Sequence, residues 1–196
     1  MRGLITNLSL RGFQDLNAEI YRRQNDRHFD TGTIVRRMIR QAIKVLGAVK
    51  DGKDDQFLSY RLGMTLSWSL ALANRLHLDL SAVFKGMIPA SRTQSLVELQ
   101  NLRMQGLESK LYEAIQLVVE ISSLDELLED FQATHESRSL QEIGRYLLME
   151  VIGLLCMVAT SAGLNLAVEM ETQFGNGCPK CLKTPCECQF SVPKMV

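Results

Sequence analysis

The stretch Leu70-Ala-Leu-Ala-Asn-Arg-Leu-His-Leu-Asp-Leu80 is matched 86 residues later by Cys156-Met-Val-Ala-Thr-Ser-Ala-Gly-Leu-Asn-Leu166. A second pair precedes it, in which Gln41-Ala-Ile-Lys-Val-Leu46 is matched by Glu113-Ala-Ile-Gln-Leu-Val118. Each stretch places its apolar residues on a stripe with helical spacing. Repetition at this scale predicts two copies of one helical unit in the chain.

Composition supports an all-α fold. The chain has 196 residues, 46% of them hydrophobic and 6% aromatic, which is enough for a substantial core. Its four prolines stand at positions 89, 179, 185 and 193, so residues 4–172 contain almost no helix breaker. We predict a first helical unit over residues 1–92, a second over 93–174 and a small tail over 175–196.

The apolar periodicity places the helices within each unit. The first unit is expected to have helices over residues 12–28, 34–49 and 56–76, and a short helix that Asp79 caps. The second is expected to have helices near residues 95–104, 108–121, 140–162 and 167–174. Between the matched pairs the spacing grows from 72 to 86 residues, and the extra segment, 122–139, is predicted to form an additional helix with an apolar edge.

Charge is segregated along the chain although the formal net charge is zero. Residues 1–92 contain 15 Lys and Arg against 8 Asp and Glu, whereas residues 93–173 contain 4 against 13. One interpretation is that the basic half and the acidic half each have a solvated, charged face. The other is that the two halves attract each other and that the basic half faces an anion. Residues 62–76 and 146–159 are apolar all round, so each unit needs the other as a cover, and we predict an internal pseudo-dimer.

The N-terminal sequence lacks the continuous apolar segment of a secretory signal. The longest apolar run, residues 146–159, is interrupted by Glu150 and is shorter than the roughly 20 residues that a membrane span needs. We therefore expect a cytoplasmic protein that does not interact with membranes.

The order of these helices, together with the Ala-Asn-x-Leu-x-Leu-Asp-Leu run at residues 73–80, resembles the MazG-like all-α nucleoside-triphosphate pyrophosphatases. The resemblance covers residues 13–86 and, more weakly, 95–174. In that family an E-x-x-E on the second helix faces an E-x-x-D on the third, and the four carboxylates hold Mg²⁺. The metal activates water for attack on a phosphoryl group. Family members commonly dimerise, which the two copies could reproduce within one chain.

The carboxylates that this resemblance requires are mostly missing. The four positions read Gln41, Lys44, Arg61 and Met64 in the first unit and Glu113, Gln116, Leu147 and Glu150 in the second. We therefore expect no catalytic residues and no magnesium. Glu113 and Glu150 are the residual candidates, and they could equally be a polar pair in the core of the bundle.

The resemblance and these substitutions favour a pseudoenzyme, a scaffold that binds a protein partner or a nucleotide. The phosphate-binding candidates are Arg37, Arg40, Lys44 and Arg61. One alternative is a residual Mg²⁺-dependent pyrophosphohydrolase that uses Glu113 and Glu150, with further acids from Glu120, Asp125 or Glu142. A second alternative is a nucleic-acid-binding protein that uses the tail and the basic half.

The tail contains Cys178-Pro-Lys-Cys181 followed by Pro185-Cys186-Glu-Cys188. Four cysteines within eleven residues indicate a Cys₄ zinc site, although the closing Cys-x-Cys is shorter than the usual second pair. Such a site would be structural, because no ligand position is left for water. Two disulfides are the alternative, although thiols stay reduced in the cytosol. A similar tail is found on some MazG-like relatives. The fifth cysteine, Cys156, is expected to be a buried apolar residue.

Overall fold

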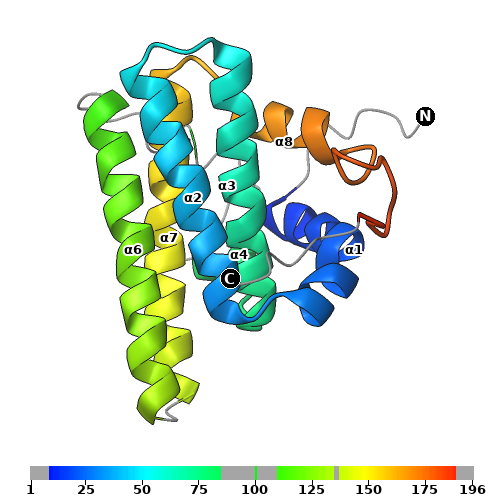
Figure 1. Cartoon of the computed structure of the whole chain (residues 1–196), viewed down its shortest axis with the longest axis vertical. Coiled ribbons are helices and arrows are strands. Elements are labelled where there is room, and N and C mark those ends of the chain that lie inside the picture. The colour runs from blue at the N-terminus through cyan, green and yellow to red at the C-terminus, as the bar shows by residue number, and fades with distance from the viewer. Residues whose placement is uncertain (1–8, 85–99, 101–109, 135–136, 189–196) are drawn as a thin grey trace, which may run out of the picture.

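The computed structural model describes residues 9–84, 100, 110–134 and 137–188. These residues form seven α-helices and no β-strand, so the predicted all-α class is confirmed (Figure 1). The helices are α1 (Leu10–His28), α2 (Thr31–Lys50), α3 (Asp55–Arg75), α4 (Leu80–Phe84), α6 (Lys110–Thr134), α7 (Ser137–Ser161) and α8 (Leu166–Phe174). The predicted linker at residues 89–93 lies outside the described residues. The helix expected near 95–104 also does, apart from Gln100.

Aspartate side chains fix where several helices begin. Asp30 accepts a hydrogen bond from the Thr33 amide at 2.6 Å at the start of α2, and Asp54 accepts one from Phe57 at 2.7 Å at the start of α3. The predicted cap of α4 is confirmed, because Asp79 accepts from the amide of Ser81 at 2.9 Å. Each cap satisfies an amide that has no partner inside its helix.

Four long helices make the bundle, in which α2 packs against both α3 and α6 while α7 packs against α3 and α6 (Figure 1). Helix α3 also contacts α1 and α8, so it is covered on several sides. The prediction from its all-round apolar sequence that α3 is central is therefore confirmed. Helix α7 is covered in the same way at Leu148, Val151, Ile152 and Leu155, which are all fully buried.

The predicted separate helix in residues 122–139 is wrong. Residues 122–134 continue α6 without a break, and α7 begins at Ser137. Ser122 and Ser123 do not end the helix, because their hydroxyls donate to the carbonyls of Val118 (2.9 Å) and Val119 (3.1 Å) one turn earlier. The inserted residues thus lengthen the helical hairpin, and Leu124 buries its side chain in the core.

One set of contacts occurs twice in the described residues, 86 positions apart. Buried Gln14 donates to the carbonyl of Leu78 at 2.6 Å and accepts from the amide of Leu80 at 3.2 Å. The same two bonds recur at 2.6 and 3.0 Å, and they involve Gln100, Leu164 and Leu166. Each glutamine thus fixes the turn that follows a core helix to a residue far away in the sequence.

The turns themselves also correspond. His77 and Gly163 both have a positive φ, 55° and 71°, at the second residue after α3 and α7. In each turn the next residue donates back into the helix, from Leu78 to Ala73 and from Leu164 to Ala159. The second turn has glycine at the position where the left-handed backbone favours it, whereas the first has histidine.

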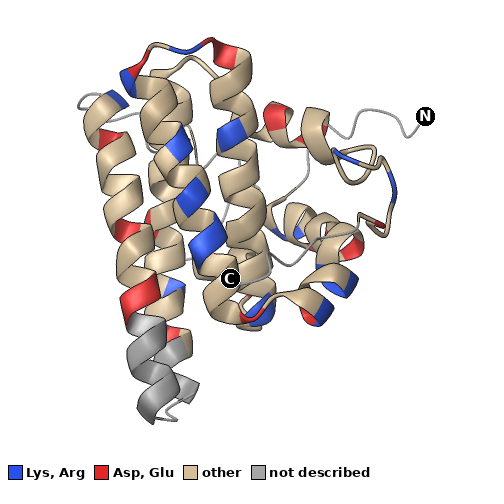
Figure 2. Cartoon of the chain, viewed as in Figure 1, with Lys and Arg blue, Asp and Glu red and all other residues tan. Residues whose placement is uncertain are grey.

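Opposite charges mark neighbouring helices of the bundle. Figure 2 shows basic residues along α2 and acidic residues along α6, which pack against each other. Within the described ranges, however, all six ion pairs lie inside the first unit or inside the tail. Apolar burial therefore holds the two hairpins together, as expected from the small contribution of exposed ion pairs.

One helical stretch, Gln141–Ser161, is long and apolar enough to cross a membrane by length and composition alone. Of its most apolar stretch, 56% is buried against the rest of the bundle. This burial is compatible with the core helix of a soluble protein.

Candidate metal centre and adjoining cavity

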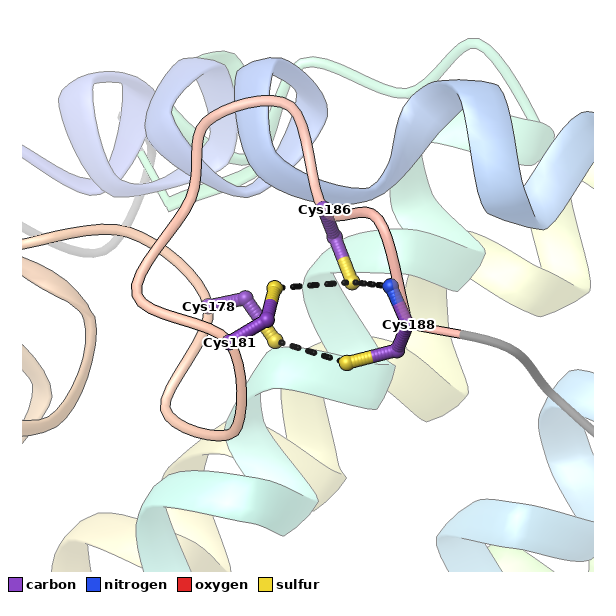
Figure 3. A group of neighbouring side chains, drawn as sticks. All are labelled: Cys178, Cys181, Cys186 and Cys188. Carbon is purple, nitrogen blue, oxygen red and sulfur yellow. Dashed lines mark hydrogen bonds between the residues drawn. The ribbon is translucent and has the colours of Figure 1, made fainter.

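The four tail cysteines converge on one point, as Figure 3 shows. All four Sγ atoms lie within 4.8 Å of one another. The separation is 3.7 Å between Cys178 and Cys188 and 3.9 Å between Cys181 and Cys186. A tetrahedral zinc ion with Zn–S bonds of about 2.3 Å requires S–S edges of about 3.8 Å. The cluster could therefore hold a metal ion, and its dimensions are compatible with zinc.

The alternative of two disulfides does not describe this arrangement. All five cysteines are free, and the sulfur separations are well above the roughly 2.05 Å of a disulfide bond. Cys156 is fully buried within α7, as predicted for a small apolar side chain.

Backbone hydrogen bonds shape the loop that carries the first two cysteines. Leu182 donates to the carbonyl of Cys178 at 2.7 Å, and Cys178 donates to the carbonyl of Lys183 at 3.1 Å. Gly177 permits this turn, since its φ is 104° and a Cβ atom there would lie 2.9 Å from the Lys183 oxygen. The loop thus presents Cys178 and Cys181 on one side.

The environments of the thiols differ. A backbone hydrogen bond from Glu187 lowers the pKa of Cys181 to about 6, which favours its thiolate form. Burial raises the pKa of Cys186 and of Cys188. The amide of Cys188 also lies 3.4 Å from Sγ of Cys186. Thiolates in buried positions need a compensating positive charge, which a divalent metal ion supplies.

Helix α1 anchors this loop. The amide of Cys186 donates to the carbonyl of Ile20 at 2.8 Å, and Gln24 donates to the carbonyl of Cys186 at 2.9 Å. Tyr21 packs edge-on against Phe174 with ring centroids 6.3 Å apart. Burial raises the pKa of Tyr21 far above its ordinary value, and a hydrogen bond with Cys178 adds to the shift. The tail is therefore seated on a helix more than 150 residues earlier in the chain.

A cavity of about 150 Å³ lies where the cysteine loop meets α1 and α3. Its lining is mainly apolar and includes three aromatic rings. The lining residues are Asn17, Tyr21, Asn25, Tyr60, Met64, Ser67, Trp68, Ala71, Cys178, Pro179, Lys180 and Cys188. A planar apolar group is the kind of ligand that such rings accommodate.

Asn17 places an unsatisfied acceptor at this cavity. Its side-chain nitrogen donates to the carbonyl of Ser67 at 3.0 Å and to the hydroxyl of Ser67 at 2.9 Å. Its Oδ1 atom has no hydrogen-bond partner, although Asn17 is only 4% exposed. Buried polar atoms are nearly always satisfied, so this oxygen is a point where a ligand could donate a hydrogen bond.

A second, more polar groove of about 590 Å³ adjoins the cavity between α1 and the end of α3. Its lining holds three arginines and three aspartates. Arg11 pairs with Asp15 at 2.9 Å, and Arg22 and Arg75 lie 3.7 and 3.6 Å from Asp26. Arg75 also donates to the carbonyl of Phe29 at 2.9 Å. This groove therefore has little free positive charge to offer an anion.

The four predicted phosphate-binding residues divide into two kinds. Arg40 and Lys44 are exposed on α2. Arg37 and Arg61 are half-buried, and each guanidinium lies over two aromatic rings. The nearer rings do not line the cavity, since the centroid of Phe29 is 4.4 Å from Arg37 and that of Phe57 is 4.7 Å from Arg61. The farther rings do line it, at 5.3 Å from Arg37 to Trp68 and 5.2 Å from Arg61 to Tyr60. Burial, followed by the charge of Arg40, lowers the pKa of Arg37.

Arg61 is held across the α2–α3 interface, where its Nη1 lies 3.3 Å from Oε1 of Gln41. Gln41 and Arg61 stand at two of the four first-unit positions where the family resemblance places Mg²⁺ ligands. Here an amide and a guanidinium contact each other at these positions. The guanidinium of Arg61 repels Mg²⁺, and the side-chain oxygen of Gln41 faces that guanidinium instead of a metal ion.

Glu113 and Glu150, the two acidic residues left at the motif positions of the second unit, are far apart. Glu113 is 1% exposed and accepts a hydrogen bond from Ser161 at 2.7 Å, while its other oxygen has no partner. Glu150 lies eleven residues before Ser161 on α7, which is about 16 Å along a helix axis. Ligands of one Mg²⁺ lie about 2.1 Å from the ion, so Glu113 and Glu150 do not share one. The further acids Glu120 and Asp125 lie on α6 and Glu142 on α7.

Sequence reasoning missed Gln14, Gln100 and Asn17. The two glutamines are themselves 86 positions apart, so extending the repeat spacing toward the N-terminus would have paired them. No sequence signal identifies Asn17, since its role depends on packing between α1 and α3.

Three comparisons of this chain with known proteins found no match. No family model matches it, and neither a curated protein nor a solved structure does.

Proposed function

We propose that this protein is a catalytically inactive, MazG-like helical scaffold that binds a nucleotide or a similar phosphate-bearing ligand without Mg²⁺. The observation that carries the proposal is the cavity beside Tyr60 and Trp68, each of which has a guanidinium over its ring. In this proposal a planar group occupies the cavity, and its phosphates extend beyond the lining residues toward Arg37 and Arg61, neither of which lines the cavity itself.

The chemistry of the residues supports binding without metal. Arginine binds phosphate directly through paired hydrogen bonds, so it replaces the charge that Mg²⁺ would supply. Arg40 and Lys44 are exposed and add to the positive charge of α2. Figure 2 shows the basic residues along this helix. The first unit has no carboxylate at the four positions of the family motif, and therefore no means of activating water through a metal.

The repeated contacts support descent of both halves from one MazG-like unit. The bonds made by Gln14 and Gln100, and the turns at His77 and Gly163, share the 86-residue spacing of the matched sequence. In this proposal the chain is an internal pseudo-dimer in which the first unit kept a ligand site and the second became its cover. Zinc at the four tail cysteines has a structural role.

Isothermal titration calorimetry of the zinc-loaded protein with AMP and ATP, in buffer without Mg²⁺, tests the proposal. Arg61→Ala should weaken binding by about tenfold or more, because a charged hydrogen bond contributes about 1.5–3 kcal/mol and 1.4 kcal/mol is tenfold in affinity. Arg22→Ala is the matched control, since Arg22 is exposed on α1 and already paired with Asp26. Absence of binding at millimolar nucleotide, or equal loss in both variants, refutes the proposal.

A protein partner is the second candidate, and an apolar stripe on the outer side of α6 favours it. Leu111, Ile115 and Val119 follow one another at helical spacing and are 42%, 42% and 49% exposed. Ile43 of the neighbouring α2 is 52% exposed. Sedimentation velocity should show self-association that Ile115→Lys abolishes. A monomer at every concentration excludes a second copy of the chain as that partner.

A further inference from the structure

We propose that metal binding by the four tail cysteines builds one wall of the cavity, so that the metal controls ligand binding at the α1–α3 site. That the ligand is a nucleotide rests on the proposed function. That the shape of the cavity depends on the metal does not rest on it.

The metal site and the cavity have residues in common. Cys178 and Cys188 line the cavity and also supply two of the four sulfur atoms. Pro179 and Lys180, which stand between the first two cysteines, complete the same wall. Any movement of the sulfur cluster therefore changes the shape of the cavity directly.

The loop has few other interactions to hold it in place. Three hydrogen bonds join it to α1, one to the carbonyl of Ile20, one from Gln24 and one between Tyr21 and Cys178. Leu182, its large apolar side chain, is 70% exposed and contributes little to burial. The ion pair between Lys183 and Glu187 is exposed and stabilises little. The folding of such a loop draws mainly on the free energy of metal binding.

The opposite wall belongs to helices that pack against each other. Tyr60, Ser67 and Trp68 belong to the central helix α3, and Asn17 belongs to α1, which packs on it. Loss of the metal should therefore release the loop and leave the bundle intact. The cavity then opens to solvent on the side of Tyr21, and the wall that contains Lys180 is lost.

Linkage makes the effect reciprocal. If the loop in its metal-bound form contributes contacts to the ligand, then metal raises the affinity for the ligand and ligand raises the affinity for metal by the same factor. The cysteine loop thus works as a metal-dependent lid over a site whose other walls are permanent.

The chain contains a single tryptophan, and it lines the cavity. Quenching of Trp68 fluorescence by acrylamide therefore reports on the wall directly. Removing zinc from the reduced protein with a chelator should increase the quenching constant at least twofold while the far-ultraviolet circular dichroism stays unchanged. Adding Zn²⁺ back should restore the original value. Unchanged quenching, or loss of the helical signal together with the metal, overturns the proposal.

Gln24→Ala tests the lid without altering a metal ligand, because Gln24 holds the loop only through the carbonyl of Cys186. This variant should retain one zinc per chain and still show increased quenching of Trp68. Gln56→Ala, at an exposed position near the start of α3, is the matched control and should behave as wild type. Equal quenching in the two variants contradicts the role given to the loop.

Calorimetry with AMP separates this inference from the proposed function. If the metal controls the cavity, AMP should bind the zinc-loaded protein at least fivefold more tightly than the zinc-free protein. Equal affinity in both forms overturns the metal control but leaves nucleotide binding standing. No AMP binding in either form, with a zinc-dependent change at Trp68, refutes the nucleotide ligand and supports the metal-dependent wall.

Discussion

Replacing Gln14 by leucine tests the architecture at its most informative buried polar residue. Gln14 is 3% exposed, and its side chain makes three hydrogen bonds, to Asn74, to the carbonyl of Leu78 and from the amide of Leu80. Leucine has a similar size, so the change removes the hydrogen bonds without leaving a large cavity.

The magnitude follows from the bonds that are lost. Each buried hydrogen bond contributes about 1 kcal/mol net, so Gln14→Leu should lower the free energy of unfolding by about 3 kcal/mol. Gln100 makes two side-chain bonds and is 8% exposed, so Gln100→Leu should cost about 2 kcal/mol. In a chain of this size these losses correspond to roughly 6–12 °C and 4–8 °C in Tm.

Urea denaturation followed by circular dichroism measures both values, with exposed Gln56→Leu as the control that should change stability by less than about 0.5 kcal/mol. Two equivalent and independent sites should also give additive losses in the double variant. A loss below about 0.5 kcal/mol for either buried glutamine would refute the claim that these residues fix the two turns.

Three further outcomes are expected. Elemental analysis of protein purified under reducing conditions should find one zinc per chain, and Cys181→Ser should abolish tight binding; zinc-free wild type contradicts the metal centre. No nucleoside triphosphate should be hydrolysed above background with Mg²⁺ or Mn²⁺, and turnover that Glu150→Gln abolishes would show this to be wrong. Asp30→Ala should cost about 1 kcal/mol at pH 7, because it removes the cap of α2. The hydrogen bond from Thr33 lowers the pKa of Asp30 below its ordinary 3.8, so this stability is present above that pH and is lost as the pH falls through the lower, folded-state pKa. Thermal melts of both proteins between pH 7 and pH 2 should therefore converge, and a constant difference would contradict the assignment.

The helices of the first unit could be read from the sequence with small errors at their ends. Their apolar spacing and the aspartates that precede them act over three or four residues, so they are visible in any short window. The reading failed at residues 122–139, where two serines and an acidic run resemble a break. There the serine hydroxyls bond to their own helix, and α6 continues.

Some features of the candidate site could also be predicted from the sequence, and others could not. The spacing of the four cysteines predicts a metal cluster, because ligands so close in sequence need only one turn to converge. The contact between Arg61 and Gln41 places two of the four motif positions of the first unit next to each other on α2 and α3. The separation of Glu113 from Glu150 was not predictable, because it depends on the register between two long helices.

By itself, the sequence determined that the chain is all-helical, that its pattern repeats after 86 residues and that its tail concentrates four thiols. These properties follow from periodicity, capping and ligand spacing, which are local. Only the tertiary structure decided that the tail folds back onto α1, where Cys186 meets Ile20, and that a cavity forms between them. It also decided that Asn17 keeps one oxygen without a partner. Such features arise from packing between segments far apart in the chain, and no short stretch of sequence encodes them.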